Sequence, residues 1–166
     1  ENEIETLTAI ARLYLKSRDS ENAKKTISQL REHALEHPDV QTQIGLLYLL
    51  QQYREEAILE FSSILKDHPE HSQARFYTAI LFEENDHLDE AYQNYSLINS
   101  SEKRFFAEAR TRMALILYKK NKNTEAIRCL DEAIKKFPTA YILHETKGNL
   151  LFISGNTSEA IKYLQL

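Results

Sequence analysis

Small and large apolar residues recur along the chain with a long period of 34 or 35 residues. Twice in each period, a large residue follows a small one by three or four positions, which puts both on one face of a helix. The small residues are Ala11, Gly45, Ala79, Ala114 and Gly148, then Ala23, Ala57, Ala91, Ala126 and Ala160; the large ones are Tyr14, Tyr48, Phe82, Leu117 and Leu151, then Ile27, Phe61, Tyr95, Leu130 and Leu164. Two antiparallel helices approach closely where small residues meet, so each period predicts one helix pair.

The pattern also gives approximate bounds for these helices. First helices are expected near 4–17, 39–52, 72–85, 104–120 and 140–153, and second helices near 20–36, 54–67, 88–98, 123–136 and 157–165. Turn-prone residues separate them at 18–20, 85–87, 121–123 and 155–156. Asp19, Asn123 and Thr157 are candidate caps for the helices that follow. The predicted fold class is therefore all-α.

The second repeat carries a recognisable motif: Ile44-Gly45, Tyr48, Ala57, Phe61 and Pro69. It resembles the tetratricopeptide repeat family, whose 34-residue unit has Leu-Gly, Tyr, Ala, Phe and Pro at fixed offsets. The resemblance extends over the whole chain and implies a right-handed α-solenoid of about five repeats. Residues 1–166 would form a single array with repeats near 4–37, 38–71, 72–106, 107–140 and 141–166, the last one truncated.

Three features depart from the family pattern. The family's Trp is absent, and the third repeat has one extra residue near 99–104. In the fifth repeat, Lys147 occupies a position where an apolar residue is expected, so the core is expected to be looser there.

The final helix lacks a following helix, so we expect the native protein to continue past Leu166. On the family resemblance, we expect the sequence to be a fragment of a bacterial tetratricopeptide protein.

Composition narrows the possible functions. The formal net charge is -4 and no basic stripe is present, so nucleic-acid binding is not expected. No run of about 18 apolar residues predicts a membrane-spanning helix. The single cysteine, Cys129, excludes an internal disulfide, and its apolar helical setting indicates a small core residue rather than a nucleophile. The compartment stays open between bacterial periplasm or cell envelope and cytoplasm, because a targeting segment would lie outside this sequence.

The resemblance also implies a binding surface, because first helices line the concave face in the family. Several first helices are apolar on more than one face, which indicates either contact with neighbouring repeats or a bound partner. The groove residues expected on this basis are Leu46, Leu49, Phe76, Ile80, Arg112, Leu115, Tyr118, Asn149 and Phe152. The sequence thus predicts a scaffold or adaptor that binds a peptide or partner helix.

Residues 100–134 are similar to repeats of bacterial envelope proteins, which favours an envelope or secretion-type assembly. Two alternatives stay open: a structural module that binds further copies of itself through exposed ends, and the repeat region of a larger enzyme. Chaperone-binding family members clamp a C-terminal carboxylate with a Lys/Asn/Asn/Lys/Arg set. The matching residues here are Thr8, Arg12, Gln43, Gln73 and Tyr77, so the clamp and a co-chaperone role are not expected.

One segment resembles a catalytic motif. His33, Glu36 and His37 form the pattern H-x-x-E-H of some zinc peptidases. The pattern has only three fixed residues and lies at a helix end without a further ligand, so a solvated helix end is the expected explanation. No phosphate-binding loop or nucleophile elbow is present. We therefore expect no enzyme activity, no cofactor and no metal.

Overall fold

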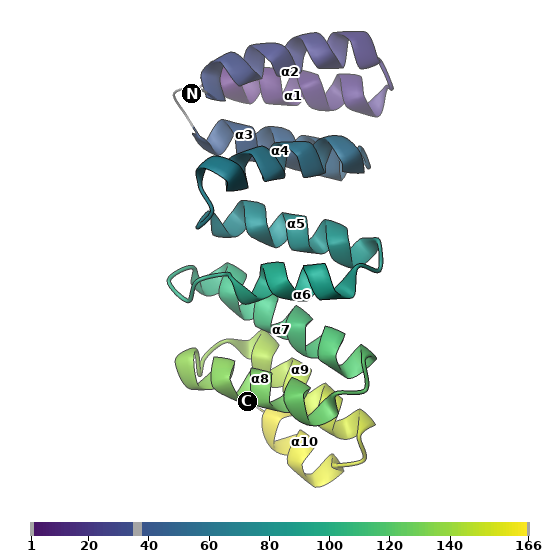
Figure 1. The fold of residues 1–166 in the computed structure, drawn as a ribbon, viewed down its shortest axis with the longest axis vertical. Helices are drawn as coiled ribbons and strands as arrows, with labels where there is room; N and C mark the ends of the chain where they lie inside the picture. The colour runs from purple at the N-terminus through teal and green to yellow at the C-terminus, as the bar shows by residue number, and fades with distance from the viewer. Residues whose placement is uncertain (1, 35–37, 166) are drawn as a thin grey trace. The chain divides into compact units, whose positions relative to one another are not determined.

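The computed structural model describes residues 2–34 and 38–165, and all regular structure in these residues is α-helical (Figure 1). The helices are α1 (Asn2–Lys16), α2 (Ser20–Ala34), α3 (Pro38–Leu50), α4 (Arg54–Asp67), α5 (Ser72–Glu84), α6 (Leu88–Ser96), α7 (Lys103–Lys119), α8 (Asn123–Lys136), α9 (Tyr141–Ile153) and α10 (Thr157–Leu164). The predicted all-α fold of helix-turn-helix repeats is confirmed. In these residues, no helix is both long and apolar enough to cross a membrane.

The chain divides into two compact units, Glu1–Leu81 and Phe82–Leu166, with the division inside α5. In the first unit, α1 packs on α2 and α3 on α4. In the second unit, α7 packs on α8 and α9 on α10, as the paired ribbons in Figure 1 show. The small residues of the repeat pattern lie at these contacts, where Ala11, Ala57 and Ala126 have no exposed surface.

The turn between the helices of each pair has the same backbone conformation throughout. Its central residue has a left-handed φ between 59° and 86° in all five turns: Arg18, Gln52, Asp86, Asn121 and Gly155. The following N–H then reaches the carbonyl five residues back, as Asn156 N–H does to Leu151 at 2.9 Å. This hydrogen bond satisfies a carbonyl at the helix end that has no partner within the helix. The four predicted turns are confirmed; the fifth, at Gln52, lacks turn-prone residues.

The predicted helix caps are only partly right. Asp19 accepts a hydrogen bond from the backbone N–H of Asn22 at 3.2 Å, as expected of a cap for α2. The predictions for Asn123 and Thr157 are wrong, because these residues are the first of α8 and α10. Lys122 and Asn156 hold the capping positions instead and make no side-chain cap hydrogen bond.

The expectation of a loose core at Lys147 is also wrong. Its side chain is only 4% exposed, between α8 and α10. The ammonium donates hydrogen bonds to Asp131 at 2.5 Å and to the hydroxyl of Tyr163 at 2.6 Å. It also lies 4.0 Å from the centre of the Tyr163 ring. Lys147 therefore replaces apolar packing with a satisfied polar contact between three helices.

Candidate protein-binding site

The predicted groove residues of the first unit take part mainly in packing. Leu46 and Leu49 on α3 are half-buried and contact the core of this unit. Phe76 on α5 is 3% exposed, so it offers almost no accessible surface to a partner. Ile80 on the same helix is half-buried. Packing inside the protein, the alternative explanation of the sequence pattern, therefore accounts for Phe76 and for part of the surface of the other three residues.

The second unit presents an accessible apolar surface on two first helices that pack side by side, α7 and α9. Leu115 on α7 is 44% exposed and Phe152 on α9 is 59% exposed. Tyr118 on α7 is half-buried, and Asn149 on α9 is exposed. Tyr118 and Phe152 hold the same position in consecutive repeats, and so do Leu115 and Asn149. We call these four residues the α7/α9 patch.

Arg112, the one charged residue expected in the groove, is engaged within the protein. Its guanidinium donates to Glu83 at 3.2 Å, and the hydroxyl of Tyr95 donates to the same carboxylate oxygen at 2.9 Å. Burial, together with the neighbouring Glu83 carboxylate, raises the pKa of Tyr95 well above its ordinary value, so the hydroxyl remains a donor. Arg112 lies one helical turn before Leu115 and therefore borders the α7/α9 patch. Its charge is neutralised by Glu83.

The residues at the carboxylate-clamp positions do not form such a clamp. Thr8 donates its hydroxyl to the carbonyl of Ile4 at 2.7 Å, and Tyr77 stacks on Phe61 with ring centres 5.6 Å apart. For the zinc-peptidase pattern, Glu36 and His37 lie outside the described residues. Over residues 2–34 and 38–165, no three His, Cys, Asp or Glu side chains group in a way that could hold a metal ion.

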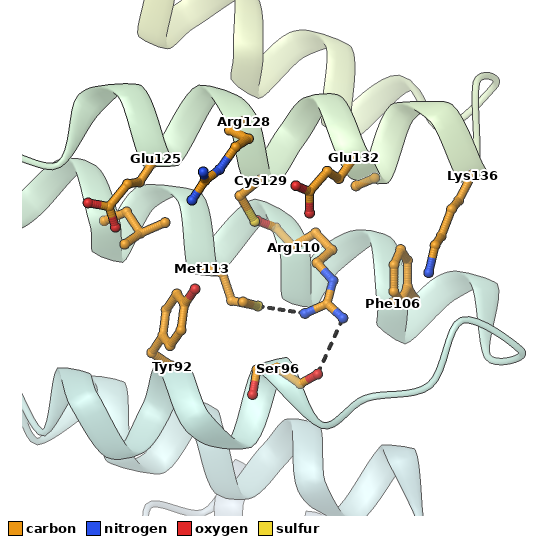
Figure 2. A pocket seen from close by; sticks show the side chains of 12 residues that line it. Tyr92, Ser96, Phe106, Arg110, Met113, Glu125, Arg128, Cys129, Glu132 and Lys136 are labelled. Carbon is orange, nitrogen blue, oxygen red and sulfur yellow. Dashed lines mark hydrogen bonds between the residues drawn. The ribbon is translucent and has the colours of Figure 1, made fainter.

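A cavity on the second unit was not anticipated from the sequence (Figure 2). It has a volume of about 340 Å³ and is lined by residues of α6, α7 and α8. Cys129 lies on its wall, with the thiol 3.8 Å from the carbonyl of Arg110. Burial raises the pKa of Cys129, which disfavours the reactive thiolate, in line with a residue that is not a nucleophile.

Two features of the sequence could have indicated this cavity. Second helices of a repeat need one apolar face for their own pair, and charged residues at helical spacing mark the other face. On α8 such a charged series runs along the cavity: Glu125, Arg128, Glu132 and Lys136. The second feature is the extra residue near 99–104, which lies in the connection between Ser96 and Phe106 of the cavity lining.

Comparisons with known proteins agree with the geometry. A tetratricopeptide repeat model matches residues 42–97 and 111–166, which together make up most of the chain. The solved structure described as "MamA RS-1 ArsTM double mutant" superposes with a TM-score of 0.69 at 15% identity, over 99% of this chain and 92% of that one. A structure of MamA from Desulfovibrio magneticus RS-1, residue 41 to the end, gives a TM-score of 0.66 at 15% identity, over 99% and 93%.

No curated protein matches the sequence significantly. At such low identity, the MamA structures show a shared fold, and the repeat model shows the family. In this family, helix pairs present surfaces to other proteins. The chain therefore belongs to the tetratricopeptide repeat family and is a protein-interaction scaffold.

Proposed function

We propose that the second unit binds an amphipathic helix or an extended apolar peptide of a partner protein on the α7/α9 patch. The observation that carries this proposal is the exposure of two large apolar side chains, Leu115 and Phe152, on neighbouring first helices. Exposed apolar clusters of this kind mark interaction sites more often than isolated surface residues do. Binding without catalysis is the role that this surface supports.

The patch has the composition of a small interface. Phe152 and Tyr118 provide aromatic side chains, which contribute much of the energy in protein interfaces. Asn149 and the Arg112–Glu83 pair supply polar groups at the edge, where a partner's backbone can form hydrogen bonds. A partner helix with apolar residues at helical spacing would cover the patch, in the manner of other helix-in-groove complexes.

The setting we propose is a bacterial envelope or secretion-type assembly. It follows from the resemblance to repeats of bacterial envelope proteins that is expected from the sequence of residues 100–134. In such an assembly the scaffold would hold a partner through a contact that can form and release. Localisation of the tagged full-length protein in a bacterial host tests the setting independently of the binding site.

The binding test compares two double variants. Leu115→Glu/Phe152→Glu places two charges in the patch and should weaken partner binding by at least about tenfold, since buried aromatic anchors often contribute that much or more. Leu59→Glu/Leu97→Glu is the matched control, because both leucines are exposed and lie outside the first helices. Crosslinking pulldown with quantified recovery provides the measurement, and circular dichroism verifies the fold. Equal recovery by both variants would reject the α7/α9 patch as the binding site.

A second candidate, self-association, is favoured by exposed apolar residues on the last helix pair. Ile153, Ile161 and Leu164 are all exposed on α9 and α10. In a repeat protein, such a face packs well against another helix pair, which a second copy could supply. Light scattering over a range of protein concentrations distinguishes the two: a strict monomer rules out self-association and leaves the α7/α9 proposal intact.

A further inference from the structure

A furrow runs along the side of α7 between α6 and α8, away from the α7/α9 patch. The cavity of about 340 Å³ in Figure 2 and a second of about 140 Å³ share the lining residues Tyr92, Leu117 and Glu125, so the two lie next to each other along α7. On α7 the lining follows one helical stripe, from Phe106 through Met113 and Leu117. Leu115 and Tyr118 lie on a different stripe of the same helix.

The furrow exists because α6 is short. This helix has 9 residues, whereas α8 has 14, so α8 and α7 continue past the end of α6. Arg110 covers that end: its guanidinium donates to the carbonyl of Ser96 at 3.3 Å and contacts Met113 Sδ at 2.8 Å (Figure 2). A cation at the C-terminus of a helix is favourable, because the last carbonyls are unpaired and partly negative.

The charge of the furrow differs from that of the whole chain. The chain has a net charge of -4, but the furrow lining contains five basic residues and three acidic ones. Two of these acidic residues already face lysines, since Asp89 pairs with Lys120 and Glu125 with Lys122. The other charged lining residues are Arg110, Arg128, Glu132 and Lys136.

The end of the furrow at the start of α7 is basic, and there the ring of Phe106 lies near two cations, Arg110 and Lys136. The Arg110 guanidinium lies 4.5 Å from the centre of the Phe106 ring, and the Lys136 ammonium lies 5.4 Å from it. Such contacts hold long basic side chains in place without neutralising their charge. A carboxylate that enters this end therefore meets cations that are already oriented.

We propose that this furrow binds an extended acidic segment of a partner protein. From Phe106 to Lys120 the α7 stripe is about 21 Å long at 1.5 Å per residue, enough for about six extended residues. The acidic side chains of such a segment would meet Arg128 and Lys136, which line the furrow and are exposed. This second binding surface is independent of the α7/α9 patch.

The single cysteine provides a direct readout, because Cys129 lines the furrow and no other thiol is present. The rate of Cys129 alkylation by iodoacetamide should fall when a peptide of alternating Glu and Leu is added. Peptides in which Gln or Lys replaces Glu should protect far less, and protection by the Glu peptide should weaken as salt is raised. Equal protection by the Gln peptide, or stronger protection by a single-stranded oligonucleotide, would overturn the proposal.

Charge-reversal variants locate the contact. Arg128→Glu/Lys136→Glu should bind the fluorescent Glu peptide roughly tenfold more weakly in an anisotropy titration. Lys135→Glu/Lys162→Glu makes the same change in charge at exposed positions outside the furrow and should alter binding less than about twofold. The same loss in both variants would show a net-charge effect and reject the furrow. Leu115→Glu/Phe152→Glu should bind the Glu peptide as wild type does, so either proposal can fail alone.

Discussion

The ring of Phe61 lies so close to Gly45 that a Cβ atom at residue 45 would be 2.6 Å from Cε1 of Phe61. Phe61 is completely buried, so its ring cannot move aside without displacing other core residues. We expect Gly45→Ala to lower the free energy of unfolding by about 1–3 kcal/mol, measured by urea denaturation. In Gly148→Ala the added Cβ would also lie 2.6 Å from a neighbouring atom, Cγ of Leu164, but Leu164 is 43% exposed and can turn outward. A larger loss from Gly148→Ala than from Gly45→Ala would contradict this explanation.

Two buried threonines on first helices differ in their hydrogen bonding. The hydroxyl of Thr78 donates to the carbonyl of Ala74 at 2.9 Å, whereas that of Thr111 is buried without a protein partner. Valine has nearly the same shape and no polar group. We expect Thr111→Val to leave stability unchanged or raise it by about 1 kcal/mol, and Thr78→Val to lower it. Thermal denaturation of both variants is the measurement; a loss for Thr111→Val as large as for Thr78→Val would refute the difference.

The buried Lys147 makes the stability of the second unit depend on Asp131. Removal of the carboxylate in Asp131→Ala leaves the ammonium buried, and we expect a loss of about 1–3 kcal/mol, moderated because Asp131 is partly exposed. Lys147→Met should cost less, because methionine fills the space and Asp131 can be hydrated. Urea denaturation of the two single variants and the double variant gives the coupling energy. Equal costs for both single variants would argue against an unpaired buried charge.

The same contact predicts a pH dependence. Burial alone lowers the pKa of Lys147, but hydrogen bonds to Asp131 and Tyr163 outweigh it, and the pKa in the folded protein is raised. A raised pKa stabilises the fold fully below the unfolded lysine value, about 10.4, and this contribution is lost as pH rises through the folded pKa. Wild type and Lys147→Met should differ in urea midpoint by a constant amount between about pH 7 and pH 10 and converge above it. No convergence would contradict the assigned direction.

The left-handed turn conformation predicts that one added methyl group, the Cβ of an alanine, lowers the stability of the fold. Gly155 has φ of +86° and nothing within 4 Å of its would-be Cβ, so Gly155→Ala tests the backbone alone. We expect a loss of about 1 kcal/mol, because a Cβ is disfavoured in this conformation. Asn121→Gly, at the equivalent turn, should be neutral or slightly stabilising. Calorimetric melting temperatures compare the two; a stabilised Gly155→Ala variant would exclude the strain argument.

The sequence predicted the helices well because each bound rests on local chemistry. The series of small residues located the helix contacts, and turn-prone residues such as Asn121 and Gly155 located most ends. Gln52 shows the limit of that signal: the left-handed turn forms at a residue with no turn preference, because the surrounding helix pair imposes it. In the same way, Asn123 and Thr157 looked like caps but fell one residue inside their helices.

The binding surface was harder to predict because exposure depends on neighbouring helices. Phe76 and Phe152 hold groove positions in the repeat pattern, yet one is buried and the other is 59% exposed. The sequence alone does not show which apolar side chain a neighbour covers. The prediction of a loose core at Lys147 was wrong for a related reason, because the partners of this residue, Asp131 and Tyr163, are each 16 residues away on other helices. The furrow beside α6 depends on a helix length that the sequence overestimated by two residues.

The ion pairs between repeats have a consequence for how the protein is made. Arg31–Glu60, Arg112–Glu83 and Lys119–Asp86 each join residues 29 to 33 positions apart, within one unit. No such pair requires distant parts of the chain to meet, and proteins with short-range contacts fold fast. Each helix pair can therefore become stable on the ribosome once the next pair has emerged. We expect the helix pairs of the first unit to be folded before translation of the chain is complete.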